Sequence, residues 1–421
     1  GYVSGMAGKW HVGEEDPDQT GIPQFTGDEE VTDPGMDEKL RQHQQAMQQR
    51  VRETAGFDEA YSVLWGNFDG FPVRQLRVHN MPWITMGAVR FLDERAKDRK
   101  PFFLYVTPTA VHGPAHQRSL QWDPVYTPGG KIEEVAEFDI DREAVREEIR
   151  SRPGADSHKY VGLSYIDHQV GMIMEHLRKS GLLDHTVVIF MADHNVEPGK
   201  ATCYEKGNKV PLVVRWPGRP ANQVCGQLVQ SVDLVRTIVE AAGVRFTAQE
   251  DLDGVNMVSL LTENADPVRE SVYVESGYAR AVRAGKYKYI AFRPPESAIQ
   301  KMKEGETSYA PNYLNVHRQA HSQIAMQYFP HYFDQDQLYD LEKDPYELNN
   351  LAYLQEYRDV LEEMKGILQG YLDSFRHPYD LERIPFMETG TYRQMMEKTK
   401  DIGTDHIEWF SRDHGGLAYP P

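Results

Sequence analysis

The chain has 421 residues, and its 64 Asp and Glu residues outnumber its 46 Lys and Arg residues, for a formal net charge of −18 at pH 7. This acidity argues against a nucleic-acid partner, because duplex binding needs a basic surface, but it leaves room for a small anionic substrate. The longest apolar run covers residues 187–192. A helix that spans a bilayer needs about 20 apolar residues, so we expect no membrane insertion.

The N-terminal part of the sequence mixes glycine-rich, helical and strand-like segments. Residues 1–13 are apolar and rich in glycine, residues 14–51 predict a loop and then a solvated helix, and residues 86–95 predict a helix. Residues 102–106 form a continuous apolar run, which predicts a strand buried on both faces. Residues 123–154 are polar and form an excursion from this pattern.

The clearest helix covers residues 163–177, where apolar side chains recur at spacings of three and four, and Gly181 follows as a C-cap. Residues 186–192 and 210–216 then predict strands, and residues 231–242 predict a further helix. Because strands alternate with helices, we predict an α/β fold with a mainly parallel sheet sandwiched by helices.

Beyond residue 268 the pattern changes to short strands and one long helix. The predicted elements are strands at 271–275 and 280–292 with a turn at Gly285, a strand at 338–341 and an amphipathic helix at 356–375. These elements predict a smaller α+β subdomain with a small antiparallel sheet. We therefore divide the sequence into a domain of residues 1–268 and a C-terminal subdomain of residues 269–421.

Chemically active side chains follow three of the predicted strands, at the edge where open α/β sheets bind ligands. If residues 1–13 are extended, Lys9 and His11 share one face and Trp10 faces the core, since side chains alternate along a strand. A cation beside an imidazole can hold an anion and move a proton. A surface lysine beside a structural histidine is the more common explanation of this tripeptide. His112, after the second strand, is by itself also more often structural.

The strand at residues 186–192 ends in Asp193 and His194, which together are ligands for a divalent cation. The alternative, equally weighted, is that Asp193 caps the following turn. Lys200 lies on the glycine-containing loop that follows, where it either reaches an anion in the same cleft or is simply solvated. Cys203 lacks a recognisable base nearby, so we do not expect it to be a nucleophile.

Cations and a metal-type pair that converge on one sheet edge favour an oxyanion ester as substrate. At this point the sequence resembles a known family. Gly8-Lys9-Trp10-His11-Val12-Gly13 is similar to the second signature of the type I, formylglycine-dependent sulfatases of the alkaline phosphatase superfamily. Further matching pieces follow in the family's order, among them Ala192-Asp193-His194, Gly199-Lys200, Arg215-Trp216-Pro217-Gly218 and Arg283-Ala284-Gly285-Lys286-Tyr287-Lys288-Tyr289.

The resemblance implies a role for each matching residue. Lys9 and Lys200 would hold the sulfate oxygens, His11 would accept a proton from the hydrated formylglycine, and His112 would assist protonation of the leaving group. The same resemblance implies a divalent metal on Asp193 and His194, most often Ca²⁺ and sometimes Mg²⁺ or Mn²⁺.

The family's first signature, Cys or Ser followed by x-Pro-x-Arg, does not occur in the sequence. We therefore expect an N-terminally incomplete sulfatase, with the formylglycine and the remaining metal ligands upstream of Gly1. By resemblance the substrate is a small or oligomeric sulfated carbohydrate, and the location is extracytoplasmic. His317, Arg318 and His321 either contact that sugar or belong to a solvated helix. The oligomeric state is not indicated.

Two other functions are compatible with the sequence. One is a phosphodiesterase or phosphonate monoester hydrolase of the same superfamily, which shares the metal pair and the position of the nucleophile. The other is a non-catalytic relative that binds sulfated glycans.

Overall fold

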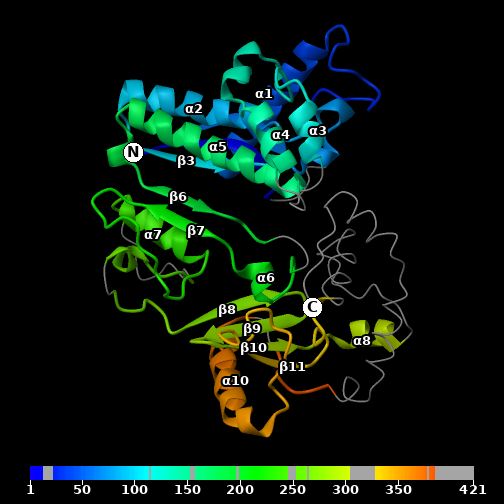
Figure 1. Ribbon diagram of the computed structural model, residues 1–421, viewed down its shortest axis with the longest axis vertical. Helices are drawn as coiled ribbons and strands as arrows, with labels where there is room; N and C mark the ends of the chain where they lie inside the picture. The colour runs from blue at the N-terminus through cyan, green and yellow to red at the C-terminus, as the bar shows by residue number, and fades with distance from the viewer. Residues whose placement is uncertain are drawn as a thin grey trace. The chain divides into compact units, whose positions relative to one another are not determined.

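The computed structural model describes residues 1–12, 22–112, 115–151, 157–195, 199–244, 253–262, 265–303, 328–376 and 379–384. These residues fall into two compact units, one formed by Gly1–Thr186 and the other beginning at Val187 (Figure 1). His317, Arg318 and His321 lie outside the described residues. The proposed sequence boundary near residue 268 marks a change of pattern and stays a prediction.

The first unit is built on a three-stranded parallel sheet with the order β2-β1-β3. Helices α2 and α5 pack against each other, and α2 contacts all three strands (Figure 1). Its elements are β1 Val3–Trp10, α1 Met36–Ala55, β2 Glu59–Trp65, η1 Phe68–Gly70, η2 Arg74–Leu76, α2 Met81–Asp98, β3 Phe102–Thr107, α3 His116–Gln121, β4 Tyr126–Thr127, β5 Gly130–Lys131, η3 Glu133–Phe138, α4 Arg142–Ser151, α5 Ser157–Lys179 and η4 Leu183–His185.

Close packing explains two of the glycines of β1. A Cβ at Gly5 would lie 2.3 Å from the ring of Phe91 on α2, so the missing side chain lets this helix sit on the sheet. Gly8 has a φ of +116°, and a Cβ there would lie 2.1 Å from the carbonyl oxygen of Thr107 on β3. Residues with a side chain are strained in such a backbone conformation. The glycine-rich start of the sequence therefore reflects a central strand approached closely from both a helix and a neighbouring strand.

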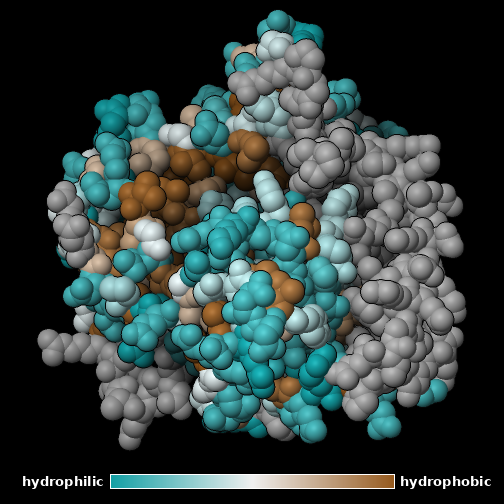
Figure 2. Space-filling view, turned by 60° about the horizontal axis from the view of Figure 1, so that its bottom comes forward, coloured by the Kyte–Doolittle hydropathy of each residue, from teal (hydrophilic) through white to brown (hydrophobic). Residues whose placement is uncertain are grey.

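Strand β3 is where the predicted strand lies, but the prediction that both its faces are buried is wrong. Phe103 and Tyr105 are 39% and 45% exposed. In the described part of the chain, β3 pairs with β1 alone and so forms one edge of the sheet. A continuous apolar run fits a central strand and an edge strand equally well, so the sequence could not make this distinction. Figure 2 shows, in brown, that apolar side chains gather in places on one face of the molecule.

Helix α5 confirms the predicted helix and part of its apolar face, since Leu177 is buried and Ile166 packs against the core. Val161 and Tyr165 are buried, whereas Leu163, predicted to lie on the apolar face, is 56% exposed. The end of the helix is as expected. Gly181 has a φ of +68°, its N–H bonds the carbonyl of Arg178 at 3.2 Å, and the N–H of Leu182 bonds the carbonyl of Leu177 at 2.9 Å. This pair of bonds is the Schellman motif, which glycine favours because it adopts the left-handed conformation without strain.

The second unit contains an antiparallel pair, β6 with β7, and a four-stranded antiparallel sheet with the order β11-β10-β9-β8 (Figure 1). The predicted strands at 186–192 and 210–216 thus pair antiparallel with each other. Its elements are β6 Val188–Met191, α6 Glu205–Asn208, β7 Leu212–Arg215, α7 Asp233–Ala241, η5 Val258–Leu261, β8 Ser271–Ser276, β9 Ala279–Ala284, β10 Tyr287–Phe292, α8 Glu296–Lys303, β11 Asp336–Asp340, η7 Gln355–Tyr357 and α10 Arg358–Leu372.

The small antiparallel sheet confirms the predicted C-terminal strands and helix. Gly285 forms the turn between β9 and β10 with a φ of +52°. Helix α10 packs Met364 and Leu368 into a core cluster with Val282, Tyr289 and Leu338 of the sheet. No helix in the described ranges is long and apolar enough to cross a bilayer.

Candidate active site

The carboxyl ends of β1 and β2 bring Lys9 next to a turn residue. The Nζ atom of Lys9 donates a hydrogen bond of 2.6 Å to the Oδ1 atom of Asn67, which follows β2. The backbone N–H of Gly66 bonds the carbonyl oxygen of Trp10 at 2.7 Å, so the two strand ends are also tied through the backbone. Lys9 is therefore held at the carboxyl edge of the sheet, where the sequence predicts it. His11 is exposed just beyond the end of β1.

His112 reaches the same turn from the end of β3. Its backbone N–H bonds the carbonyl of Thr109 at 3.1 Å, and its ring lies edge-on to that of Phe68, with the centroids 6.3 Å apart. Because Phe68 directly follows Asn67, Lys9 and His112 contact adjacent residues of one turn. The structure therefore brings these two predicted residues toward one another within the first unit.

Sequence analysis missed both β2 and Asn67. The reason is a bulge in β2. Along β1 the pairing advances from Ala7 to Lys9, while along β2 it advances from Tyr61 to Leu64. Ser62, inside this bulge, has a φ of +47° and donates a hydrogen bond of 2.6 Å to the carbonyl of Trp83. The bulge breaks the alternation of buried and exposed residues that identifies a strand.

In the second unit, Asp193 and His194 follow β6 and face each other. The Nε2 atom of His194 lies 3.4 Å from the Oδ2 atom of Asp193, and its Nδ1 atom lies 2.7 Å from the carbonyl oxygen of Asn195. The backbone N–H of His194 also bonds the Oδ1 atom of Asp193 at 2.8 Å. Asp193 therefore takes part in a local turn, as the capping alternative expects, and still presents a carboxylate that is 83% exposed.

Lys200 is placed by close backbone contact between two glycines. A Cβ at Gly199 would lie 2.3 Å from the carbonyl carbon of Lys206, and one at Gly207 would lie 2.0 Å from the oxygen of Gly199. The backbone N–H of Asn195 donates a hydrogen bond of 3.1 Å to the carbonyl of Gly207. The loop that carries Lys200 and the turn of Asp193 and His194 are thus both tied to Gly207.

The donor pair fits part of a shell for a divalent cation. Asp193 offers the carboxylate that Ca²⁺, Mg²⁺ and Mn²⁺ prefer, whereas the imidazole of His194 is a ligand type that suits Zn²⁺ and other transition metals better. Ca²⁺ takes about six to eight ligands, so this pair would supply a minority of them. Within the described residues, no three His, Cys, Asp or Glu side chains are grouped to hold a metal by themselves.

Cys203 lies close to this loop in sequence but is not suited to nucleophilic chemistry. Its side chain is buried, and its Sγ atom lies 3.9 Å from the carbonyl oxygen of Val274. Burial raises the pKa of the thiol to about 12, because a thiolate would be poorly solvated there. The expectation from the sequence agrees with this environment.

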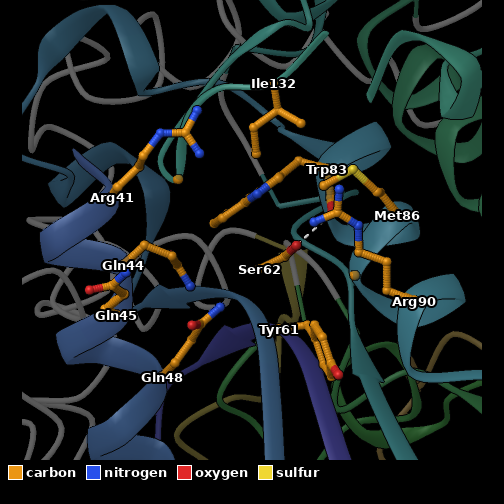
Figure 3. Close-up of a pocket in the computed structure, with 12 residues that line it drawn as sticks. Arg41, Gln44, Gln45, Gln48, Tyr61, Ser62, Trp83, Met86, Arg90 and Ile132 are labelled. Atoms are coloured by element: carbon orange, nitrogen blue, oxygen red, sulfur yellow. Dashed lines mark hydrogen bonds between the residues drawn. The ribbon is translucent and has the colours of Figure 1, made fainter. Parts of the chain in front are cut away.

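The cavity shown in Figure 3 lies away from the predicted residues. It has a volume of about 190 Å³, lies between α1 and α2, and has Tyr61 and Ser62 in the middle of β2 at its base. Arg41 pairs with Asp37, Arg90 pairs with Glu134, and the indole of Trp83 is buried. Its cations are thus neutralised locally, and the cavity offers no sulfate site comparable to the strand ends.

The strand ends hold a lysine, an amide and a histidine in the first unit. The β6 turn and its following loop hold a carboxylate, an imidazole and a lysine in the second. Groups of these kinds can neutralise charge on an anionic ester and transfer protons. The Sulfatase family model matches residues 1–244, more than half of the chain. The chain therefore belongs to the sulfatase family, within the alkaline phosphatase superfamily. A second model, described as N-sulphoglucosamine sulphohydrolase, C-terminal, matches residues 199–299.

Curated relatives carry the same family identity at modest similarity. Human arylsulfatase A is 28% identical over 389 residues, which cover 83% of this chain and 64% of the relative. An ulvan-active sulfatase of Formosa agariphila is 28% identical over 233 residues, which cover 51% of this chain and 37% of the relative. The chain thus spans less than two thirds of the length of these relatives.

Solved structures show the same fold. The crystal structure of Ps i-CgsB in complex with k-i-k-neocarrahexaose matches 94% of this chain and 76% of that chain, with a TM-score of 0.54 and 18% identity. A structure solved in complex with its substrate D-glucosamine-2-N,6-O-disulfate matches 89% of this chain and 80% of that chain, with a TM-score of 0.50 and 17% identity. The predicted α/β fold with a C-terminal subdomain is thereby confirmed.

Proposed function

We propose that the chain hydrolyses sulfate esters of a carbohydrate, with Lys9, His11, His112 and Lys200 as catalytic residues and Asp193 and His194 as metal ligands. The observation that carries the proposal is that Lys9 and His112 contact the adjacent residues Asn67 and Phe68 of the turn after β2, in a member of the sulfatase family. The carboxyl edge of a parallel sheet is the expected place for such chemistry.

Each residue has a distinct chemical task in this proposal. Lys9 and Lys200 neutralise the charge on the sulfate oxygens as the ester bond breaks. His112 protonates the oxygen of the departing alcohol, and His11 accepts a proton from the hydrated formylglycine that the family resemblance implies. A divalent ion, when bound, would withdraw charge from the sulfate and the nucleophile. The formylglycine expected from the resemblance would lie upstream of Gly1.

The names of several relatives support a carbohydrate substrate. They include the ulvan-active sulfatase and an N-acetylgalactosamine-6-sulfatase from the dog. A relative named choline-sulfatase represents a small non-carbohydrate ester. Saccharide sulfates and choline sulfate should therefore be compared directly, and faster turnover of choline sulfate would contradict the carbohydrate assignment. We further propose an extracytoplasmic location, which cell fractionation would test.

Lys200→Ala in the full-length, formylglycine-matured protein tests the proposal. We expect kcat/KM on an aryl sulfate to fall by roughly 10²- to 10³-fold, as when one charge-stabilising donor is removed from an active site. The melting temperature should barely change, because a half-buried loop lysine contributes little packing. Lys209→Ala, which changes an exposed lysine just before β7, is the matched control and should leave both quantities unchanged.

The wild-type protein separates the remaining functions. Faster hydrolysis of an aryl phosphodiester than of the aryl sulfate would favour a phosphodiesterase. Binding of a sulfated glycan with no turnover of either ester would favour a glycan-binding relative. Loss of activity in Lys200→Ala in proportion to a loss of folded protein would refute the catalytic assignment.

A further inference from the structure

The hairpin formed by β9 and β10 contains a buried lysine that the proposed reaction does not use. Lys288 is 1% exposed and lies directly opposite Arg283 in the antiparallel register. Two like charges facing each other across a sheet are destabilising. A buried ammonium group is also costly unless it is paired. The pair therefore needs an anion that comes from another element.

Two carboxylates supply the compensating charge. Glu205, at the start of α6, lies 3.2 Å from the Nζ atom of Lys288 through one oxygen and 3.0 Å from Arg283 through the other. Glu347, which is 1% exposed, lies 3.0 Å from Lys288 and accepts the backbone N–H of Glu205 at 2.6 Å. Two cations and two carboxylates thus form one network, in which Lys288 and Glu347 are buried and Arg283 and Glu205 are half-buried; we call it the α6 clamp.

Helix α6 depends on such contacts because it has four residues. Helices this short have no stability of their own in water. Both ends of α6 are engaged. Glu205 belongs to the clamp, and Gly207 contacts Gly199 and accepts the hydrogen bond from Asn195. The helix therefore connects the clamp to the two segments that carry Lys200 and the pair Asp193 and His194.

Stability alone does not require buried charges at this place. Well-packed apolar residues often stabilise a protein as well as a buried ion pair does. An ammonium group held by two carboxylates differs from an apolar contact because it fixes direction as well as distance. Displacements of about 1 Å can cost an active site roughly 100-fold in rate, so direction matters beside an anion site.

We propose that Lys288 is a positioning residue, which fixes α6 through Glu205 and Glu347 and thereby sets the Lys200 loop and the Asp193–His194 turn for binding sulfate and metal. The inference rests on the proposed function for its catalytic consequence. Its structural part is the coupling of the hairpin to residues 193–209. This part does not depend on the proposed function, and amide hydrogen exchange measures it directly.

The test compares Lys288→Met with Lys286→Met in the full-length protein. Lys286 lies on the same hairpin, where it pairs with buried Asp340 at 3.2 Å and lies over the ring of Tyr287, and neither partner belongs to α6. In Lys288→Met we expect kcat on an aryl sulfate to fall and the inhibition constant of inorganic sulfate to rise, each by roughly 10- to 100-fold. Amide hydrogen exchange at Asn195 and Gly207 should accelerate. Lys286→Met should change none of the three.

Lys288→Met leaves surplus negative charge in the interior, so a second variant separates misfolding from misplacement. Lys288→Met combined with Glu347→Gln removes the surplus and keeps the pair of Arg283 with Glu205. We expect this double variant to regain thermal stability while kcat, sulfate inhibition and exchange stay impaired. If kcat, sulfate inhibition and amide exchange recovered together with thermal stability, the inference would be overturned, since the clamp would then be a stabilising contact only.

The two proposals fail in distinguishable ways. If the wild-type protein does not turn over sulfate esters, the proposed function fails, and exchange at Asn195 and Gly207 still decides the positioning role. Faster exchange in the Lys288 variants, and not in Lys286→Met, would support the coupling. Unchanged exchange, with or without sulfatase activity, would overturn it.

Discussion

At the scale of single residues, the structure distinguishes side chains by what surrounds them. Lys9 and Lys288 are both lysines near turns, yet Lys9 meets a neutral amide and Lys288 meets two carboxylates. The amide of Asn67 orients the ammonium group of Lys9 and itself carries no charge, whereas two carboxylates neutralise the charge of Lys288. The same reasoning separates exposed Asp193 from buried Asp340, whose charge is matched by Lys286.

Asp193→Ala tests the metal assignment. We expect the affinity of the full-length protein for its divalent ion to fall by roughly tenfold or more, because the loss of a direct ligand costs at least as much as the loss of a supporting group. Metal content after dialysis, measured by mass spectrometry, is the readout. Asp266→Ala, which changes an exposed carboxylate in the same unit, is the control. An unchanged metal stoichiometry in Asp193→Ala would remove Asp193 from the shell.

The two cysteines should differ sharply in reactivity. At pH 8, iodoacetamide should label exposed Cys225 and spare Cys203, whose pKa of about 12 keeps it protonated and whose thiol is buried. Peptide mapping of the native protein should locate the label at Cys225, and mapping after denaturation should find both sites. Labelling of Cys203 at a comparable rate in the native protein would contradict the buried environment.

At the scale of elements, the close approach of β1 and β3 predicts a strong effect of Gly8→Ala. A methyl group there would overlap the carbonyl of Thr107, and the φ of +116° disfavours any side chain. We expect a loss of roughly 2–4 kcal/mol in the free energy of unfolding. Gly27→Ala shares a positive φ of +90° but meets no atom within 4 Å, so its smaller loss isolates the conformational part. Equal losses in the two variants would show that the overlap is relieved.

The sequence predicted those elements whose structure follows from their own residues, and it did not predict features that depend on neighbouring elements. The hairpin around Gly285 and helix α10 follow from a turn residue and a helical period, and both were confirmed. Strand β2 was not predicted because the bulge at Ser62 interrupts the alternation of buried and exposed residues. Asn67 was not predicted because a single amide on a turn has no sequence signature. The exposure of β3 depends on its neighbours in the sheet, which its own residues do not encode. Lys9 and Asp193 stood out because they follow predicted strands, and the family resemblance then implied their roles.

At the scale of the whole molecule, the net charge of −18 opposes the compact state. The screening length falls from about 30 Å at 0.01 M salt to about 10 Å at 0.1 M. At the higher salt concentration, repulsion between exposed charges on distant parts of the surface is therefore largely screened. Protonation of all 16 histidines would bring the formal charge from −18 to −2. His43 stays neutral at pH 5.5, because burial lowers its pKa to about 4. Repulsion should therefore be strong at pH 8 and weaker near pH 5.5.

Salt should consequently stabilise the protein at pH 8. Raising NaCl from 0.01 M to 0.15 M should increase the melting temperature by roughly 1–3 °C, and the increase should shrink near pH 5.5. Choline chloride at equal concentration should act alike if screening is the cause, whereas an effect of NaCl alone would indicate binding of a specific ion. A melting temperature that falls with salt would show that attractive pairs such as the α6 clamp outweigh the overall repulsion. The pairs of that clamp are buried or partly buried, so salt screens them less than it screens the surface charges. We therefore expect the repulsion to dominate the response.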